Sequence, residues 1–234
     1  MSNTVESYLM RRQPTAARPL LGLTVLLVED SRFASEAVRL MCLRSGARIR
    51  RADCLASAHK HLRSYRPSVV IVDLGLPDGD GEEFIKHLAT EAHPVQVILA
   101  TSGDPDGETR AIAAGAQGFM EKPVANLGAF QQTILSFLPP ESRPLGLRVM
   151  PDDTVTPDRL ALQDDIAHVA ELLSAPDQDR PVDYIAQFLS GVARSADDKP
   201  LCAAAEALGK SPGSETLAKL TALVTQRLEN RATL

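Results

Sequence analysis

Five side chains with catalytic or ligating groups each lie at or just beyond the end of a short apolar segment. They are Glu29, Asp30, Asp73, Thr101 and Lys122. If the apolar segments are strands of one parallel sheet, their carboxyl ends meet at a single edge, where ligands bind in such sheets. The sequence therefore predicts a pocket that collects three carboxylates, a hydroxyl and an ammonium group.

Three carboxylates in one pocket repel one another unless a cation lies among them. Their ligand atoms are all oxygens, which suits a hard ion such as Mg²⁺. An ionised Asp73 is then a candidate nucleophile toward phosphorus, because the metal and Lys122 can neutralise charge on the transferring group. The hydroxyl of Thr101 can donate to a phosphoryl oxygen. These residue types predict Mg²⁺-dependent phosphoryl transfer.

Residues 22–138 alternate between apolar, β-branched segments and segments of helical period. The predicted strands are 23–28, 47–52, 68–72, 95–99 and 117–120. The predicted helices are about 32–45, 54–65, 81–91, 106–114 and 125–138. Several strands are nearly all apolar, which is typical of a parallel sheet covered by helices on both faces. The predicted fold class is α/β, with a doubly wound five-stranded parallel sheet.

The segments VLLVEDS, VVIVDLGLPDGDGEEF, ILATSG and GFMEKP resemble the receiver domain of two-component response regulators. The resemblance covers residues 22–138 and implies a flavodoxin-like fold. It implies that Asp73 is the phosphoacceptor, and that Asp30 ligates Mg²⁺ directly while Glu29 acts largely through water.

The same resemblance assigns roles to residues on the later strands. It implies that Lys122 pairs with the phosphoryl group, that Thr101 and Phe119 form a conformational switch, and that the Lys122-Pro123 bond is cis. The backbone carbonyl of Gly75 would complete the metal shell. Gly75 is a departure, because the family more often carries a longer side chain there.

Two other interpretations use the same pattern. A receiver-like domain that has lost its chemistry would usually lack the acceptor Asp or the Lys, and both Asp73 and Lys122 are present. A haloacid-dehalogenase-type phosphatase also uses an Asp nucleophile, but it requires a second Asp at position 75. Gly75 excludes that assignment.

The strand and helix alternation ends at Pro139-Pro140, and the following residues have the composition of a linker. Beyond it the apolar residues recur at helical spacing in four segments, which predicts a small helical bundle. The expected organisation is an N-terminal arm, a receiver domain, a linker and a four-helix output or interaction domain. Their respective ranges are 1–21, 22–138, 139–156 and 157–230.

Residues 151–234 contain 14 acidic and eight basic residues, a net charge of −6 within a chain whose total is −5. Nucleic-acid binding domains usually show the opposite balance, so we expect no nucleic-acid partner. DNA binding by the C-terminal helices remains an alternative, with the junction of the third and fourth helices as the candidate element.

His168 is predicted to point away from the apolar face of its helix. A second phosphotransfer station at His168 is therefore another alternative, although Glu171 stands where such domains usually have a basic residue. The acidic pairs of the C-terminal part are expected to be helix caps and surface charges. They are Asp152-Asp153, Asp164-Asp165 and Asp197-Asp198.

No apolar run approaches the roughly 20 residues of a membrane-spanning helix, and the first residues lack the apolar stretch of a secretory signal. The three cysteines are isolated and suit reduced thiols, so we expect a cytoplasmic protein. The predicted function is that of a response regulator with Mg²⁺ as its cofactor. It would accept a phosphoryl group on Asp73 from a sensor histidine kinase or histidine phosphotransfer protein, and later hydrolyse it. The helical domain would bind an unknown downstream protein or form a homodimer, and it carries no signature of a separate enzyme.

Overall fold

The computed structural model describes residues 13–92, 95–176 and 180–229. At its centre is a five-stranded parallel sheet with the order β2-β1-β3-β6-β7. These strands are β1 (Thr24–Val28), β2 (Arg48–Ala52), β3 (Val69–Asp73), β6 (Val97–Ser102) and β7 (Gly118–Glu121). The α/β fold class predicted from the sequence is confirmed.

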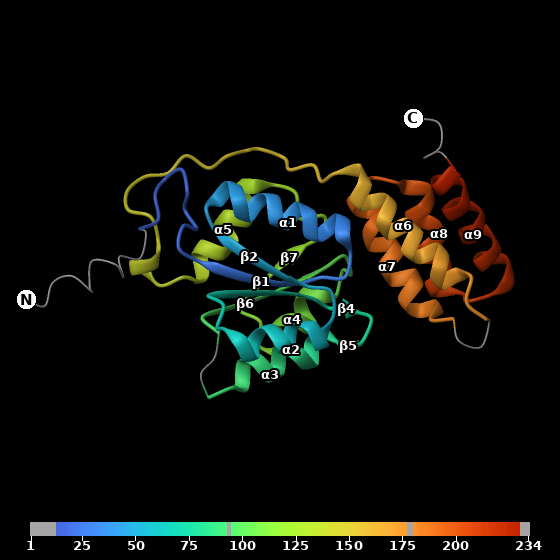
Figure 1. Cartoon of the computed structure of the whole chain (residues 1–234), viewed down its shortest axis with the longest axis horizontal. Helices are drawn as coiled ribbons and strands as arrows, with labels where there is room; N and C mark the ends of the chain where they lie inside the picture. Colours follow the sequence, from blue (N-terminus) through green and yellow to red (C-terminus); the bar gives the residue numbers. More distant parts are fainter. Residues whose placement is uncertain (1–12, 93–94, 177–179, 230–234) are drawn as a thin grey trace, which may run out of the picture.

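Helices cover both faces of this sheet (Figure 1). One face carries α1 (Arg32–Ser45) and α5 (Leu127–Phe137), and the other carries α2 (Leu55–Ser64), α3 (Gly81–Thr90) and α4 (Gly107–Ala114). Successive side chains of a strand point to opposite faces. Accordingly Leu27 packs toward α1 and α5, whereas Leu26 packs toward the other helices. Burial on both faces explains why the central strands are almost entirely apolar.

Local capping fixes where the helices begin and end. The Ser31 side chain accepts a hydrogen bond from the backbone N–H of Ala34 at 3.0 Å, and Gly46 ends α1 with a φ of 85°. Asn126 caps α5 through the N–H of Ala129. Side-chain oxygens at these positions bind N–H groups that have no partner within the helix.

A short antiparallel pair, β4 (Gly75–Leu76) and β5 (Gly79–Asp80), follows β3 directly and was not predicted from the sequence. Two residues per strand are too few to produce a periodic pattern. The pair matters because it brings Gly75 to the carboxyl edge of the sheet, beside Asp73.

The C-terminal part of the chain forms a helical bundle that lies across the carboxyl end of the sheet (Figure 1). Its helices are α6 (Arg159–Leu173), α7 (Val182–Ser195), α8 (Lys199–Lys210) and α9 (Ser214–Glu229). They share a separate apolar core that includes Ile166, Leu189 and Leu208. Asp198 caps α8 and also forms an ion pair with Arg227 of α9 at 2.6 Å.

The segments predicted as arm and linker partly pack on the receiver domain. Leu20 is fully buried there, whereas residues 1–12 of the arm lie outside the described residues. After a 3₁₀ turn at Pro140–Ser142, Leu145 and Leu147 are exposed, but Val155 is buried against the sheet. The backbone N–H of Val155 donates to the carbonyl of Ala125 at 2.8 Å. The linker is therefore fastened to the receiver before α6 begins.

No helix in the described part of the chain is both long and apolar enough to cross a membrane.

The bundle core gives a direct stability test. Leu189 is fully buried, so Leu189→Ala should lower the free energy of unfolding by about 2–5 kcal/mol, because it leaves a cavity. Urea denaturation followed by circular dichroism measures this change. The matched control is Leu160→Ala, where the side chain is 61% exposed, and its effect should stay within about 0.5 kcal/mol. Equal losses in the two variants would contradict a packed C-terminal core.

Candidate active site

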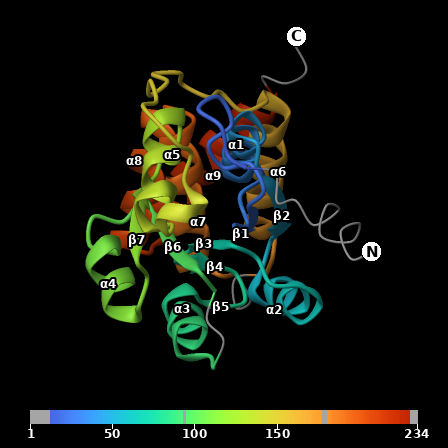
Figure 2. The same cartoon turned by 90° about the vertical axis from the view of Figure 1, so that its left-hand side faces the viewer.

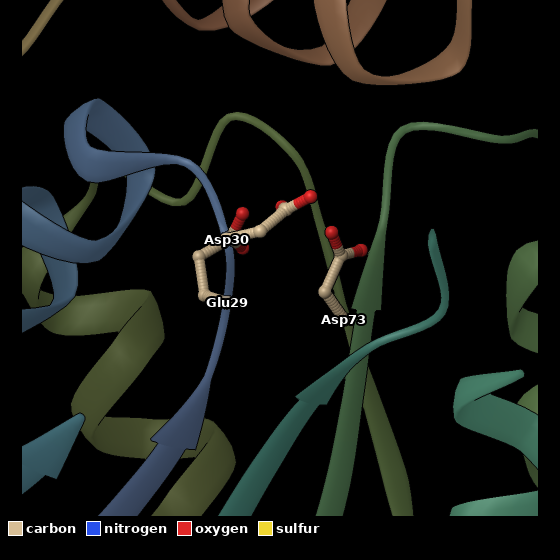
Figure 3. A group of neighbouring side chains, drawn as sticks. All are labelled: Glu29, Asp30 and Asp73. Carbon is tan, nitrogen blue, oxygen red and sulfur yellow. The ribbon is translucent and has the colours of Figure 1, made fainter. Parts of the chain in front are cut away.

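The fold brings the five predicted side chains to one edge of the sheet. Asp73 is the last residue of β3, Glu29 and Asp30 follow the adjacent β1, and their carboxylate oxygens lie within 4.8 Å of one another (Figure 3). Thr101 pairs with Asp73 in the register of β6 with β3, and Lys122 follows β7. Parallel pairing of β1, β3, β6 and β7 produces this convergence, because their carboxyl ends share one direction.

Lys122 is the cation that holds the carboxylates together. Its buried Nζ atom lies 2.9 Å from Oδ2 of Asp73 and 2.8 Å from Oε2 of Glu29. Burial disfavours the charged ammonium group, but the two carboxylates outweigh this effect and raise the pKa of Lys122. The Lys122-Pro123 peptide bond is cis, as the resemblance implied.

One ammonium group does not balance three carboxylates. Burial, followed by the charge of Asp73, raises the pKa of Asp30 to about 7. Burial likewise raises the pKa of Glu29 well above its ordinary value, against the opposing effect of Lys122. A clustered set of oxygen ligands with excess negative charge fits a hard divalent cation such as Mg²⁺.

Of the predicted switch residues, Thr101 is the last residue but one of β6, and Phe119 lies within β7. The buried hydroxyl of Thr101 donates to the backbone carbonyl of Met120 at 2.8 Å. Phe119 is half-buried and packs beside Gly107 of α4. In this state the Thr101 hydroxyl is therefore engaged between β6 and β7, and not with Asp73.

The helical bundle completes the surroundings of the carboxylates, with one of its helices passing above them (Figure 3). The hydroxyl of Tyr184 on α7 donates to Oδ2 of Asp30 at 2.8 Å, and the guanidinium of Arg194 donates to the carbonyl of Gly103. A cavity of about 480 Å³ separates the two domains. It is lined by Asp73 and Lys122 on one side and by Gln187 and Phe188 on the other.

The environment of Asp165 differs from the one expected from the sequence. The sequence analysis treated Asp164-Asp165 as cap and surface charges, but Asp165 is only 2% exposed and caps a helix of the other domain. Its carboxylate accepts hydrogen bonds from Ser31 Oγ at 2.7 Å and from the backbone N–H groups of Arg32 and Phe33 at 2.8 and 3.0 Å. These contacts join α6 to the first turn of α1. Asp164 is half-exposed and forms a surface ion pair with Arg32.

His168 is exposed, as predicted, and its ring contacts Phe188. It lines a separate open cleft of about 1100 Å³ with Asp30 and Tyr184, and not the cavity that contains Asp73. No local pattern marked Tyr184, Gln187 or Asp165, because their partners lie more than 100 residues away in sequence.

Comparison with known proteins identifies the first domain. Residues 25–134 match the family model of the response regulator receiver domain. The transcriptional regulatory protein KdpE of Escherichia coli is 38% identical over 100 residues, which cover 42% of this chain and 44% of KdpE. The virulence transcriptional regulatory protein PhoP of Salmonella typhimurium is 32% identical over 101 residues, covering 42% and 45%. The alignments thus span less than half the length of these curated relatives.

Among solved structures, the receiver domain of the sensor histidine kinase PA1611 from Pseudomonas aeruginosa is 19% identical. The alignment covers 49% of this chain and 96% of that domain, with a TM-score of 0.45. That structure has a magnesium ion coordinated in its active-site cleft. The family match identifies residues 25–134 as a response regulator receiver domain, the domain type of two-component signalling. The match ends before the helical bundle begins.

The raised pKa of Asp30 predicts a pH-dependent stability without metal. Folded Asp30 retains its proton to about pH 7, whereas the unfolded carboxyl loses it near 3.8. The folded state thus binds more protons in this window, so its stability should fall as pH rises from 5 to 7.5. Thermal unfolding in EDTA measures this slope.

Asp30→Asn should unfold at a higher temperature at pH 7.5 and show a shallower slope, since it removes a negative charge that lies beside those of Glu29 and Asp73. Glu29 leaves a residual slope of the same sign. Asp53→Asn, an exposed acid beyond β2, is the control and should behave as the wild type. Parallel slopes for all three proteins would contradict the assignment.

Proposed function

We propose that this protein is a two-component response regulator that accepts a phosphoryl group on Asp73. The observation that carries the proposal is the contact of Lys122 with Asp73 beside the carboxylates of Glu29 and Asp30. An ammonium group at one oxygen of Asp73 leaves the other oxygen available as the nucleophile. The position of this group within a receiver domain supports the same role.

The reaction is a displacement at phosphorus. An oxygen of Asp73 forms a bond to the phosphorus of a phosphohistidine, the bond from phosphorus to the imidazole nitrogen breaks, and that nitrogen keeps the electron pair. Lys122 stabilises the negative charge of the transferring group. Glu29, Asp30, Asp73 and the Gly75 carbonyl would hold Mg²⁺, which supplies further charge neutralisation. Water later attacks the phosphorus of the acyl phosphate and the bond from phosphorus to the Asp73 oxygen breaks. Inorganic phosphate leaves, and the carboxylate is restored. We propose a sensor histidine kinase or a histidine phosphotransfer protein as the donor.

Phosphorylation can be tested with a small donor. Incubation with acetyl phosphate and Mg²⁺ should add one phosphoryl group, detected by intact mass, and both Asp73→Asn and EDTA should abolish the addition. Asp53→Asn is the matched control and should be labelled normally. Persistent labelling of Asp73→Asn would remove Asp73 from the mechanism.

For the helical bundle we propose protein interaction or homodimerisation as the output. Thr101 and Phe119 would transmit the change of state, as the switch residues of the resemblance. The free thiols of Cys42, Cys54 and Cys202 suit a cytoplasmic location. His168 is the candidate for a second phosphotransfer station. Its ring is exposed, so a partner can reach it, and this accessibility is the one feature that favours the alternative.

DNA binding is the second candidate output, because KdpE and PhoP are named as transcriptional regulators. Its basic groups at the junction of α8 and α9 are few. Arg227 is already paired with Asp198, which leaves Lys210 and Lys219 against a segment of net charge −6.

We therefore expect no gel shift of mixed-sequence duplex DNA by micromolar full-length protein at physiological salt, with or without acetyl phosphate. Even non-specific binders have dissociation constants of about 10⁻⁴ to 10⁻⁶ M under such conditions. A shift that strengthens as salt is lowered, and weakens in a Lys210→Glu, Lys219→Glu variant, would favour the DNA-binding output.

A further inference from the structure

The N-terminal N–H groups of α1 are bound by a carboxylate from the other domain. The N-terminal N–H groups of a helix carry partial positive charge and attract a carboxylate. Asp165 satisfies two of them, those of Arg32 and Phe33, and also accepts from the Ser31 hydroxyl. Burial raises the pKa of Asp165, and these hydrogen bonds oppose that effect. A buried carboxylate with several donors is a specific docking contact, and not a surface charge that happens to lie nearby.

The same docking brings a hydroxyl onto a candidate metal ligand. Tyr184 donates to Oδ2 of Asp30, and its ring packs against Phe188 on the same helix. This hydrogen bond of 2.8 Å engages one of the two oxygens that Asp30 would offer to a metal ion. In the docked state, one oxygen of Asp30 is thus already stabilised by a protein donor before any cation arrives.

Gly75 lies against α7 of the bundle. A Cβ atom at this position would collide with the side-chain amide of Gln187. A side chain at position 75 would therefore require the flexible end of Gln187 to move aside. The glycine that departs from the usual pattern of receiver domains leaves this space to Gln187.

We propose that α6 and α7 form a cap on the phosphoacceptor pocket, and that Mg²⁺ and the cap compete for Asp30. Asp165 and Tyr184 are the latch that closes this cap. The inference rests on the proposed function, because it takes Asp30 as a metal ligand. Closure of the cap and binding of Mg²⁺ are then coupled reciprocally. The closed cap weakens Mg²⁺ binding, and Mg²⁺ favours the open cap by the same factor.

The affinity for Mg²⁺ tests the latch without any phosphodonor. Isothermal titration calorimetry of the full-length protein should show about tenfold tighter Mg²⁺ binding for Tyr184→Phe than for the wild type. This variant keeps the aromatic ring and removes only the donor to Asp30, and tenfold is about the effect expected of such a bond. Asp165→Asn should change the affinity in the same direction, because it weakens the docking of α6 on α1.

Asp164→Asn is the matched control for Asp165→Asn. It neutralises the adjacent acid, whose ion pair is exposed on both sides and contributes little. Its Mg²⁺ affinity should remain within twofold of the wild type. Equal affinities for the wild type, Tyr184→Phe and Asp165→Asn would overturn the proposal, as would an equal gain in Asp164→Asn.

Hydrogen exchange measures the reciprocal effect. Saturating Mg²⁺ should accelerate exchange at the N–H groups of Arg32 and Phe33 and within α7 of the wild type, while α8 and α9 stay unchanged. Unaltered or slower exchange at these positions would show that Mg²⁺ binds without moving the cap.

Asp30→Asn separates failure of the cap from failure of the proposed function. If Asp30→Asn weakens Mg²⁺ binding and the latch variants do not tighten it, the metal site stands and the cap proposal fails. If Asp30→Asn leaves Mg²⁺ binding unchanged, or no protein binds Mg²⁺, the metal site of the proposed function fails, and the cap proposal fails with it.

Discussion

The contact of Lys122 with Glu29 and Asp73 is the interaction on which the receiver pocket depends. These carboxylates are buried at the ends of neighbouring strands, where like charges would otherwise drive the strand ends apart. The ammonium group comes from the far side of the sheet, beyond β7, and reaches Glu29 beyond β1. Because the attraction needs this strand order and the parallel alignment of all the strands, the electrostatics of the pocket and the topology of the sheet support each other.

A second electrostatic constraint joins the two domains. The carboxylate of Asp165 accepts hydrogen bonds from the backbone N–H groups of Arg32 and Phe33. It thereby provides an N-terminal cap that α1 does not supply by itself. Since α1 begins just after Glu29 and Asp30, a contact made at its first turn lies beside the pocket. The bundle therefore cannot dock at α1 without also covering the acidic residues, and Tyr184 and Gln187 occupy the space that results.

The fastening of the linker has a related consequence. Val155 and the backbone around Asp153 are held at the start of α5, so only a few residues separate the receiver from the first turn of α6. A short tether keeps the effective concentration of α6 near α1 high. The latch contacts can then close the cap although each of them is a modest interaction by itself.

The sequence by itself determined the receiver. Its strands and helices follow from alternation and helical period, which are local properties, and the pocket residues stand at strand ends in the order that a parallel sheet requires. The sequence also indicated helices at the C-terminus and the cap at Asp198, again from local spacing. The sequence did not reveal the β4–β5 pair, because its strands are too short to produce a periodic pattern. It also did not reveal the burial of Asp165, because the sequence around Asp165 does not distinguish it from its exposed neighbour Asp164. Only the tertiary structure decided that Asp165 caps α1 and that Tyr184 reaches Asp30, because those contacts join residues 132 to 154 positions apart and depend on how two separately packed cores come together.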